Sequence, residues 1–132
     1  MTIFQSMQRL ACAFALLVLA GGSLSVAASA EDLGPPVGTV APDIGTRLDQ
    51  TGRPHRLTDL MGKSGLVLFF FRSADWCPYC QAQLIDVNGG VAEIEKRGYR
   101  VAGLSYDSPE ILQAFTVKRH LTYTLLSDPK SE

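Results

Sequence analysis

Residues that bind metals or build disulfide frameworks are scarce in this chain. Its 132 residues include three cysteines and two histidines, His55 and His120. A structural zinc site needs four ligands, and neither histidine stands at a ligand-like spacing from a cysteine. A haem attachment motif needs a histidine directly after its second cysteine, and Gln81 takes that place after Cys80. We therefore expect neither a metal site nor a bound cofactor.

The chain also lacks an excess of charge of either sign. It has 12 lysine and arginine residues against 13 aspartate and glutamate residues, for a formal net charge of −1. No internal repeat or low-complexity segment is visible. Nothing in this balance points to nucleic acid or to an anionic membrane surface as a partner.

The N-terminus has the pattern of an export signal rather than of a membrane span. Arg9 supplies positive charge, residues 10–20 (LACAFALLVLA) form an apolar stretch, and residues 28–30 (ASA) place small side chains at a cleavage site. A helix needs roughly 20 apolar residues to cross a bilayer, so this stretch is short for a retained anchor, which is the alternative. We predict a signal peptide over residues 1–30, cleaved near Ala30. Export to a bacterial periplasm is compatible with so short a signal.

Cleavage changes what the chain contains. Cys12 leaves with the signal, and its place before the bulk of the apolar stretch is not that of a lipid-attachment cysteine. Arg9 leaves too, with no acidic residue, so the net charge falls from −1 to −2. The mature chain keeps only Cys77 and Cys80, and an oxidising compartment favours disulfide chemistry for them. We expect no stable membrane insertion after cleavage.

The mature chain reads as one small domain after a short lead-in. Residues 31–38 (EDLGPPVG) are rich in proline and glycine and predict an extended lead-in, and residues 39–132 predict the domain. About 100 residues suffice for one hydrophobic core. Residues 48–57 predict a hairpin that turns at Thr51 and Gly52. Thr58 is placed to cap a short helical turn.

Strands and helices then alternate. Residues 66–71 (LVLFFF) lack polar alternation, as expected for a central strand covered on both faces. A helix is predicted over residues 78–97, with a kink or break at residues 88–90 (NGG), because each glycine costs about 1 kcal/mol relative to alanine. The remaining predicted elements are a strand over residues 99–106, a helix that starts at Pro109 with Ser108 as its cap, and a strand over residues 122–126. This order predicts an α/β fold whose central sheet is mostly parallel and flanked by helices.

Each predicted helix has one apolar side that should face the core. The residues on these sides are Leu84, Ile85, Val87, Val91 and Ile94 in the first helix, and Ile111, Leu112 and Phe115 in the second. Gly98 is placed to end the first helix, since glycine adopts the left-handed conformation that commonly closes a helix.

The chemistry is predicted at the junction of the apolar strand and the first helix, which reads Trp76, Cys77, Pro78, Tyr79, Cys80. Pro78 suits the first helical position, because it has no N–H to leave unsatisfied. Cys77 then becomes the N-cap, where the free N–H groups of the helix stabilise a thiolate. Cys80 lies within the first turn, with its Cβ ~5–6 Å from that of Cys77, close enough for a disulfide. We therefore expect Cys77 to attack a partner and Cys80 to resolve the mixed disulfide.

The aromatic residues around the two cysteines predict where a partner binds. Trp76 and Tyr79 flank the pair and are expected to offer it an apolar surface. The expected partners are protein or small-molecule thiols and disulfides. The competing interpretation is a structural disulfide, which is common in exported proteins.

Beyond the cysteine pair, several segments follow one another as landmarks do in a known family. They are residues 40–44 (VAPDI), 71–72 (FR), 76–84 (WCPYCQAQL), 101–110 (VAGLSYDSPE) and 125–129 (LLSDP). In this order they resemble the redoxins, the thioredoxin-fold family that includes alkyl hydroperoxide reductase C and the thiol-specific antioxidant proteins. The resemblance covers nearly all of residues 38–132. It implies a thioredoxin-like fold, antioxidant or thiol–disulfide oxidoreductase activity, and Cys77 as the nucleophile.

Two positions depart from the peroxiredoxin members of that family. Where they carry proline and a threonine or serine before the peroxidatic cysteine, this chain has Phe70 and Ala74. The hydroxyl normally orients the peroxide, and Ala74 has none. The tetrapeptide of residues 77–80 also resembles that of glutaredoxins. We therefore expect an exported thiol–disulfide oxidoreductase that contributes to cell redox homeostasis, with a thiol-dependent peroxidase acting on hydroperoxides as the alternative.

The second departure is at the end of the chain. After a segment like residues 125–129, the family continues through a strand with a cis-proline, another strand and a final helix, whereas this sequence stops at Glu132. Pro129 does not resemble that cis-proline, and Arg72 is interpreted as a solvated cation at a strand end rather than as a catalytic arginine. We expect a fold that is incomplete at its C-terminus, with a sheet edge liable to pair with other chains. A further alternative is an inactive remnant that only binds partners.

Overall fold

The structure is a computed structural model that describes residues 35–131. The chain divides into two compact units, Met1–Val40 and Ala41–Glu132, and the second holds the sheet. Of the first unit, residues 35–40 are described, and they contain a turn in which Thr39 donates to the Pro36 carbonyl from both its N–H and its hydroxyl. The predicted signal peptide lies outside the described residues. None of the helices in the described part is long and apolar enough to cross a membrane.

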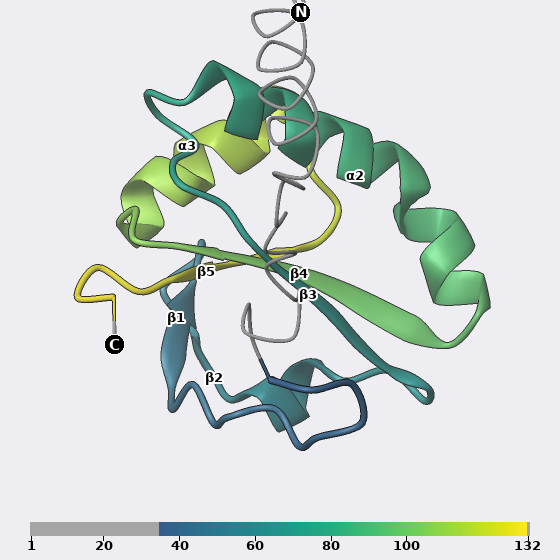
Figure 1. The fold of residues 1–132 in the computed structure, drawn as a ribbon. Helices are drawn as coiled ribbons and strands as arrows, with labels where there is room; N and C mark the ends of the chain where they lie inside the picture. Colours follow the sequence, from purple (N-terminus) through teal and green to yellow (C-terminus); the bar gives the residue numbers. More distant parts are fainter. Residues whose placement is uncertain (1–34, 132) are drawn as a thin grey trace, which may run out of the picture. The chain divides into compact units, whose positions relative to one another are not determined.

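A five-stranded mixed sheet forms the centre of the domain (Figure 1). Its order is β2-β1-β5-β4-β3, made of β1 (Arg47–Asp49), β2 (Pro54–His55), β3 (Gly65–Phe70), β4 (Tyr99–Ser105) and β5 (Thr124–Ser127). Strands β3, β4 and β5 are parallel, whereas β1 runs antiparallel to both β5 and β2. The predicted α/β fold, its mostly parallel sheet and its early hairpin are therefore confirmed.

Two helices make the parallel connections. Helix α2 (Pro78–Lys96) joins β3 to β4, and α3 (Pro109–Arg119) joins β4 to β5. Figure 1 shows both helices on one side of the sheet and the 3₁₀ helix η2 (Leu57–Leu60) on the other. Because both crossovers have the usual right-handed sense, two helices that connect strands in the same direction along the sheet share one face.

Each face of the sheet carries its own apolar cluster. On the helical face the cluster includes Leu84 and Val91 of α2, Leu112 and Phe115 of α3, and Leu125 of β5. On the opposite face Leu60 of η2 packs with Ala102, Leu104 and Leu126, and Ile44, Leu66 and Leu68 lie against them. Two of the predicted core positions are wrong, because Ile85 is 42% exposed and Ile111 is 36% exposed.

The position of β3 corrects one prediction. Its apolar sequence predicted a central strand, but among the described residues β3 is the edge strand beside β4. Val67 and Phe70 are accordingly exposed. An apolar edge strand offers unpaired backbone groups to another strand, so the predicted liability of a sheet edge falls on this element.

Helix α2 corrects a second prediction, since it runs without a break through its two glycines. The hydrogen bonds of Asn88 explain why the helix continues through residues 88–90. Its side-chain oxygen accepts from the N–H (2.8 Å) and the hydroxyl (3.0 Å) of Thr122, and its amide donates to the His120 carbonyl at 3.3 Å. The middle of α2 is thereby bonded to the connection that leads into β5, and tertiary contacts outweigh the low propensity of glycine.

The helix starts differ in detail from the predicted caps. The N-cap of η2 is Arg56 rather than Thr58. Ser108 does occupy the N-cap of α3, but its side chain makes no capping bond to the backbone. Gly98 has a φ of 87° just after α2, as predicted for the residue that closes this helix.

A buried carboxylate stabilises the hairpin of β1 and β2. Asp49 is 3% exposed and accepts from the Thr51 N–H (2.7 Å) and hydroxyl (2.6 Å), from the Arg53 N–H (3.0 Å), and pairs with Nε2 of His55 at 2.9 Å. Burial alone would raise the pKa of Asp49. The hydrogen bonds lower it by more than burial raises it, so the pKa falls from 3.8 to about 2. The hairpin therefore depends on an ionised Asp49.

This carboxylate makes the stability of the domain depend on pH. A carboxyl group whose pKa is lower in the folded state stabilises the fold above its unfolded pKa, and this contribution is lost as the pH falls towards 2. Its size is about 2 kcal/mol for a shift of this extent. In urea unfolding between pH 7 and pH 2, Asp49→Asn should lose stability at pH 7 and match the parent near pH 2. Asp86→Asn, at an exposed position of α2, should follow the parent throughout; a constant deficit of Asp49→Asn at every pH would contradict the assignment.

Candidate active site

The two cysteines lie where β3 leads into α2, at the carboxyl end of the parallel strands. Pro78 is the first residue of α2 and Cys77 is its N-cap, as predicted. The Sγ of Cys77 accepts from the backbone N–H of Cys80 at 3.3 Å. A sulfur that accepts hydrogen bonds at a helix N-terminus is stabilised as a thiolate.

Both cysteines are free thiols and both are buried. Cys77 is 0% exposed and Cys80 is 7% exposed, and no disulfide joins them. Burial raises the pKa of the Cys80 thiol, but hydrogen bonds from the Cys77 thiol, from the backbone of Ser73 and Arg72 and from the Arg72 guanidinium lower it, for a pKa of about 7. The Cys80 thiol therefore ionises near neutral pH. The assignment of the attacking role to Cys77 and the resolving role to Cys80 stays a prediction.

Arg72 is exposed near the end of β3, as predicted, but it also contacts the candidate site, which the sequence did not indicate. Its Nη2 donates to Cys77 Sγ at 3.4 Å. Its guanidinium carbon also lies 5.2 Å from the centre of the Trp76 ring. The hydrogen bond to Cys77 and the charge of that sulfur raise the pKa of Arg72. A cation in contact with the sulfur favours the charged form of the thiol.

Asp107 holds the loop that leads to Cys77. It lies just after β4, is 4% exposed, and accepts from the Ser73 hydroxyl (2.8 Å), the Ala74 N–H (2.7 Å) and the Ser105 hydroxyl (3.0 Å). Ser73 in turn accepts from the backbone N–H of Asp75 at 3.0 Å. The end of β4 therefore determines the path of the loop between β3 and α2. A signal for this was present in the sequence, because polar residues that follow adjacent parallel strands meet at one edge of the sheet.

The two flanking aromatic residues are exposed, as an apolar surface for a partner requires. Trp76 is 54% exposed and Tyr79 is 85% exposed. Nε1 of Trp76 donates to the hydroxyl of Tyr106 at 2.9 Å, which fixes the ring between the loop and the end of β4. Tyr79 is the second residue of α2. Their role as a surface for a partner stays a prediction.

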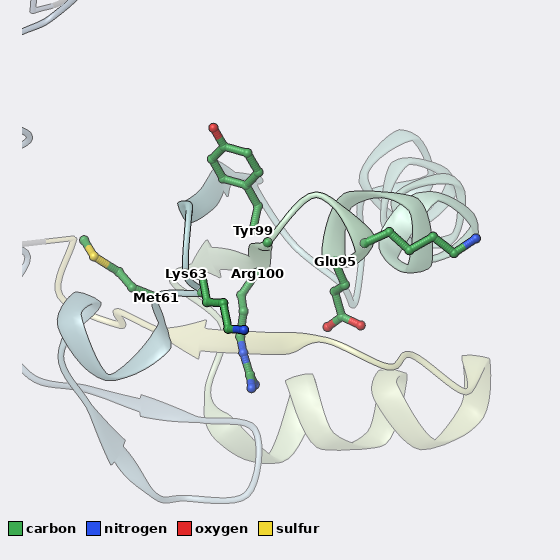
Figure 2. Close-up of a pocket in the computed structure, with 8 residues that line it drawn as sticks. Met61, Lys63, Glu95, Tyr99 and Arg100 are labelled. Carbon is green, nitrogen blue, oxygen red and sulfur yellow. The ribbon is translucent and has the colours of Figure 1, made fainter.

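A separate open pocket of about 560 Å³ lies away from the cysteines (Figure 2). It is formed where the residues before β3, the end of α2 and the start of β4 meet, and its lining includes Met61, Lys63, Glu95, Tyr99 and Arg100. Figure 2 shows Tyr99 projecting away from Lys63 and Arg100. None of the candidate residues lines this pocket, so its size does not make it the active site. Nowhere in residues 35–131 do three or more histidine, cysteine, aspartate or glutamate side chains gather as a metal site requires.

The fold and the site define a thioredoxin-fold protein with two free thiols at a helix N-terminus. The chain belongs to the AhpC/TSA family, whose model matches residues 37–132. The predicted resemblance to the redoxins is therefore confirmed.

Several relatives and solved structures that the chain resembles are named as peroxiredoxins or as a peroxidoxin. It is 40% identical over 96 residues to Peroxiredoxin bcp1 of Schizosaccharomyces pombe, over 73% of this chain and 48% of that protein. It is 39% identical over 80 residues to Peroxiredoxin Bcp of Escherichia coli, over 61% of this chain and 50% of that protein. Its structure resembles Peroxidoxin BcpB of Mycobacterium tuberculosis with a TM-score of 0.64 and 30% identity, over 71% of this chain and 60% of that one.

The chain spans about half the length of the curated relatives it matches. These relatives support a peroxiredoxin relationship, so they favour the alternative interpretation, a thiol-dependent peroxidase, over the disulfide exchange that the sequence was expected to support. Peroxide reduction and disulfide exchange are both reactions of thiol-dependent oxidoreductases.

Proposed function

We propose that this protein is a thiol-dependent peroxidase of the peroxiredoxin type that uses Cys77 and Cys80. The observation that carries the proposal is that a chain of the AhpC/TSA family places two free thiols at the N-terminus of α2, with Arg72 in contact with one of them. A thiolate at that position is the nucleophile that hydroperoxide reduction requires.

The reaction has two chemical steps and a recycling step. The thiolate of Cys77 attacks the distal oxygen of a hydroperoxide; the S–O bond forms as the O–O bond breaks, and the alkoxide takes up a proton and leaves as an alcohol. The thiol of Cys80 then attacks the resulting sulfenic acid, which forms the disulfide and releases water. An external dithiol reduces the disulfide by thiol exchange and restores both thiols.

Disulfide exchange is the second candidate function, and one feature of the site favours it. Ala74 offers no hydroxyl to a peroxide, and its backbone N–H is already bonded to Asp107. Exchange needs only the two thiols: Cys77 attacks a disulfide, displaces one thiolate, and Cys80 releases the second as the Cys77–Cys80 disulfide forms. Peroxide reduction and exchange therefore share the same nucleophile and differ in the group it attacks.

One experiment separates the two functions. The reduced protein is mixed with a hydroperoxide, and peroxide loss and thiol loss are followed together; a parallel sample receives insulin and a reductant. A peroxidase consumes one peroxide for each pair of thiols as the Cys77–Cys80 disulfide forms, and in Cys80→Ser it leaves a sulfenic acid on Cys77 that dimedone captures. Thiols that stay intact in peroxide while insulin is reduced would establish exchange in its place.

We also propose export, on the signal pattern of residues 1–30. Cleavage near Ala30 predicts that the natural protein begins at Glu31. The intact mass of the protein from its source cell tests this, and a mass that includes residues 1–30 would contradict it.

A further inference from the structure

Arg72 contacts the reacting sulfur from a place outside the helix. It lies two residues after the end of β3, and its guanidinium donates to Cys77 Sγ from the loop, while the backbone N–H of Cys80 donates to the same sulfur from the helix. The guanidinium also lowers the pKa of the Cys80 thiol. A single cation therefore acts on both sulfurs of the pair.

An exposed arginine needs support to stay in one place, and the neighbouring residues supply it. The Arg72 guanidinium lies over the Trp76 ring at 5.2 Å, in the range of a cation–π interaction. The ring is itself held by the 2.9 Å hydrogen bond from Trp76 Nε1 to the Tyr106 hydroxyl. Tyr106 follows β4, so the chain of contacts runs from the end of β4 through Trp76 to the guanidinium and ends at the sulfur.

We propose that Arg72 holds negative charge on the Cys77–Cys80 pair, and that Trp76 and Tyr106 are positioning residues that keep its guanidinium against the sulfurs. The proposal rests on the proposed function of the same thiols. It assigns a role to three residues besides the two cysteines. When the thiol ionises, its proton leaves to water and the guanidinium balances the charge that remains. Trp76 thus has a second task besides offering a surface to a partner.

Other charged groups lie on the segments around the loop that leads to Cys77. Asp75 lies exposed in the same loop, and Asp107 lies buried after β4, where its carboxylate is bonded to Ser73 and Ala74. Lys118 of α3 lines a small pocket together with Ala74, Asp75 and Gln81. Of these groups, Arg72 is the one whose hydrogen bond to the sulfur is seen, and Lys118 provides a matched cation on the neighbouring helix.

The test is the rate at which the reduced full-length protein reacts with iodoacetamide between pH 5 and pH 10. The thiolate displaces iodide as the new S–C bond forms, so the rate follows the ionised fraction. Peptide mass analysis assigns the label to Cys77 or Cys80 and separates it from Cys12. Arg72→Met should move the midpoint of the rate profile of the pair up by about one pH unit, which lowers the rate about tenfold below both midpoints.

The further variants make the result specific. Arg72→Lys keeps the positive charge but loses the planar guanidinium group. Its midpoint should therefore lie between those of the parent and of Arg72→Met. Trp76→Leu and Tyr106→Phe should each move the midpoint upward by less than Arg72→Met, whereas Lys118→Met should leave it in place. An Arg72→Met profile that superimposes on that of Lys118→Met would overturn the proposal, and so would a lower plateau with an unchanged midpoint.

Two further results cover the cases in which Arg72→Met does not fold or the proposed peroxidase activity is absent. Should Arg72→Met lose its circular dichroism spectrum, Tyr106→Phe decides, because it removes one hydroxyl group: an upward shift supports the proposal and an unchanged midpoint overturns it. Alkylation needs no peroxide, so a parent protein that consumes no hydroperoxide yet shows the Arg72 shift would refute the proposed peroxidase and leave this inference standing.

Discussion

Replacing Cys77 with serine should reduce peroxide consumption by roughly 1,000-fold or more, since removal of a nucleophile eliminates the covalent step. A serine hydroxyl at the N-cap still accepts the N–H of Cys80, so the start of α2 should be preserved. The measurement is the initial rate of peroxide loss with an excess of external dithiol. Circular dichroism of the variant should match that of the parent, which separates lost chemistry from lost structure.

Cys80→Ser is the matched control, because it changes the other sulfur of the same pair. It should still consume one equivalent of peroxide, stop at a sulfenic acid on Cys77, and accept dimedone there. The lowered pKa of Cys80, about 7, means that the opposite assignment is chemically available. One equivalent of peroxide consumed by Cys77→Ser, with a sulfenic acid on Cys80, and no first turnover in Cys80→Ser would exchange the roles of the two cysteines.

The local parts of the fold were predictable because they depend on neighbours in sequence. Pro78 after Cys77 correctly placed the start of α2, and Gly98 correctly placed its end. The hairpin around Gly52, which has a φ of 79°, follows from turn chemistry in the same way. Each of these features depends on a few consecutive residues, so the local sequence pattern is sufficient to predict it.

The predictions that were wrong concern features that depend on contacts between distant segments of the chain. The apolar run in β3 does not distinguish a central strand from an apolar edge, because both require the same residues. The continuity of α2 depends on the bonds from Asn88 to Thr122, which no local pattern contains. The contact of Arg72 with Cys77 could not be predicted for the same reason, since it depends on how the intervening loop folds back.

The site as a whole depends on two strand ends that meet. Cys77 follows β3, and Asp107 and Tyr106 follow β4, so residues far apart in the chain hold one loop and one ring. Cys77 is buried directly after this loop, which Asp107 anchors through Ser73 and Ala74. The reactivity of the thiols and the stability of the loop are therefore linked through Asp107.

Asp107→Ala should destabilise the domain by about 3 kcal/mol and slow the first peroxide turnover. The variant leaves the Ala74 N–H and the hydroxyls of Ser73 and Ser105 without their acceptor in a buried place, and unsatisfied buried donors cost about 1–3 kcal/mol each before the site relaxes. Urea unfolding monitored by circular dichroism measures the stability. The loss of the Ala74 anchor displaces the N-cap, so the turnover of folded protein should fall about 10- to 100-fold.

Two companion variants identify the cause. Asp107→Asn keeps one acceptor oxygen for the Ala74 N–H, while its amide group forces the Ser73 hydroxyl to turn, so it should cost about half as much as alanine. Asp75→Ala removes an exposed carboxylate from the same loop and should change the stability by less than about 0.5 kcal/mol. Equal losses for Asp107→Ala and Asp75→Ala would show that loop charge, rather than the buried acceptor, supports the site. An Asp107→Ala protein that is less stable but turns over at the parent rate would show that the loop keeps Cys77 in place without it.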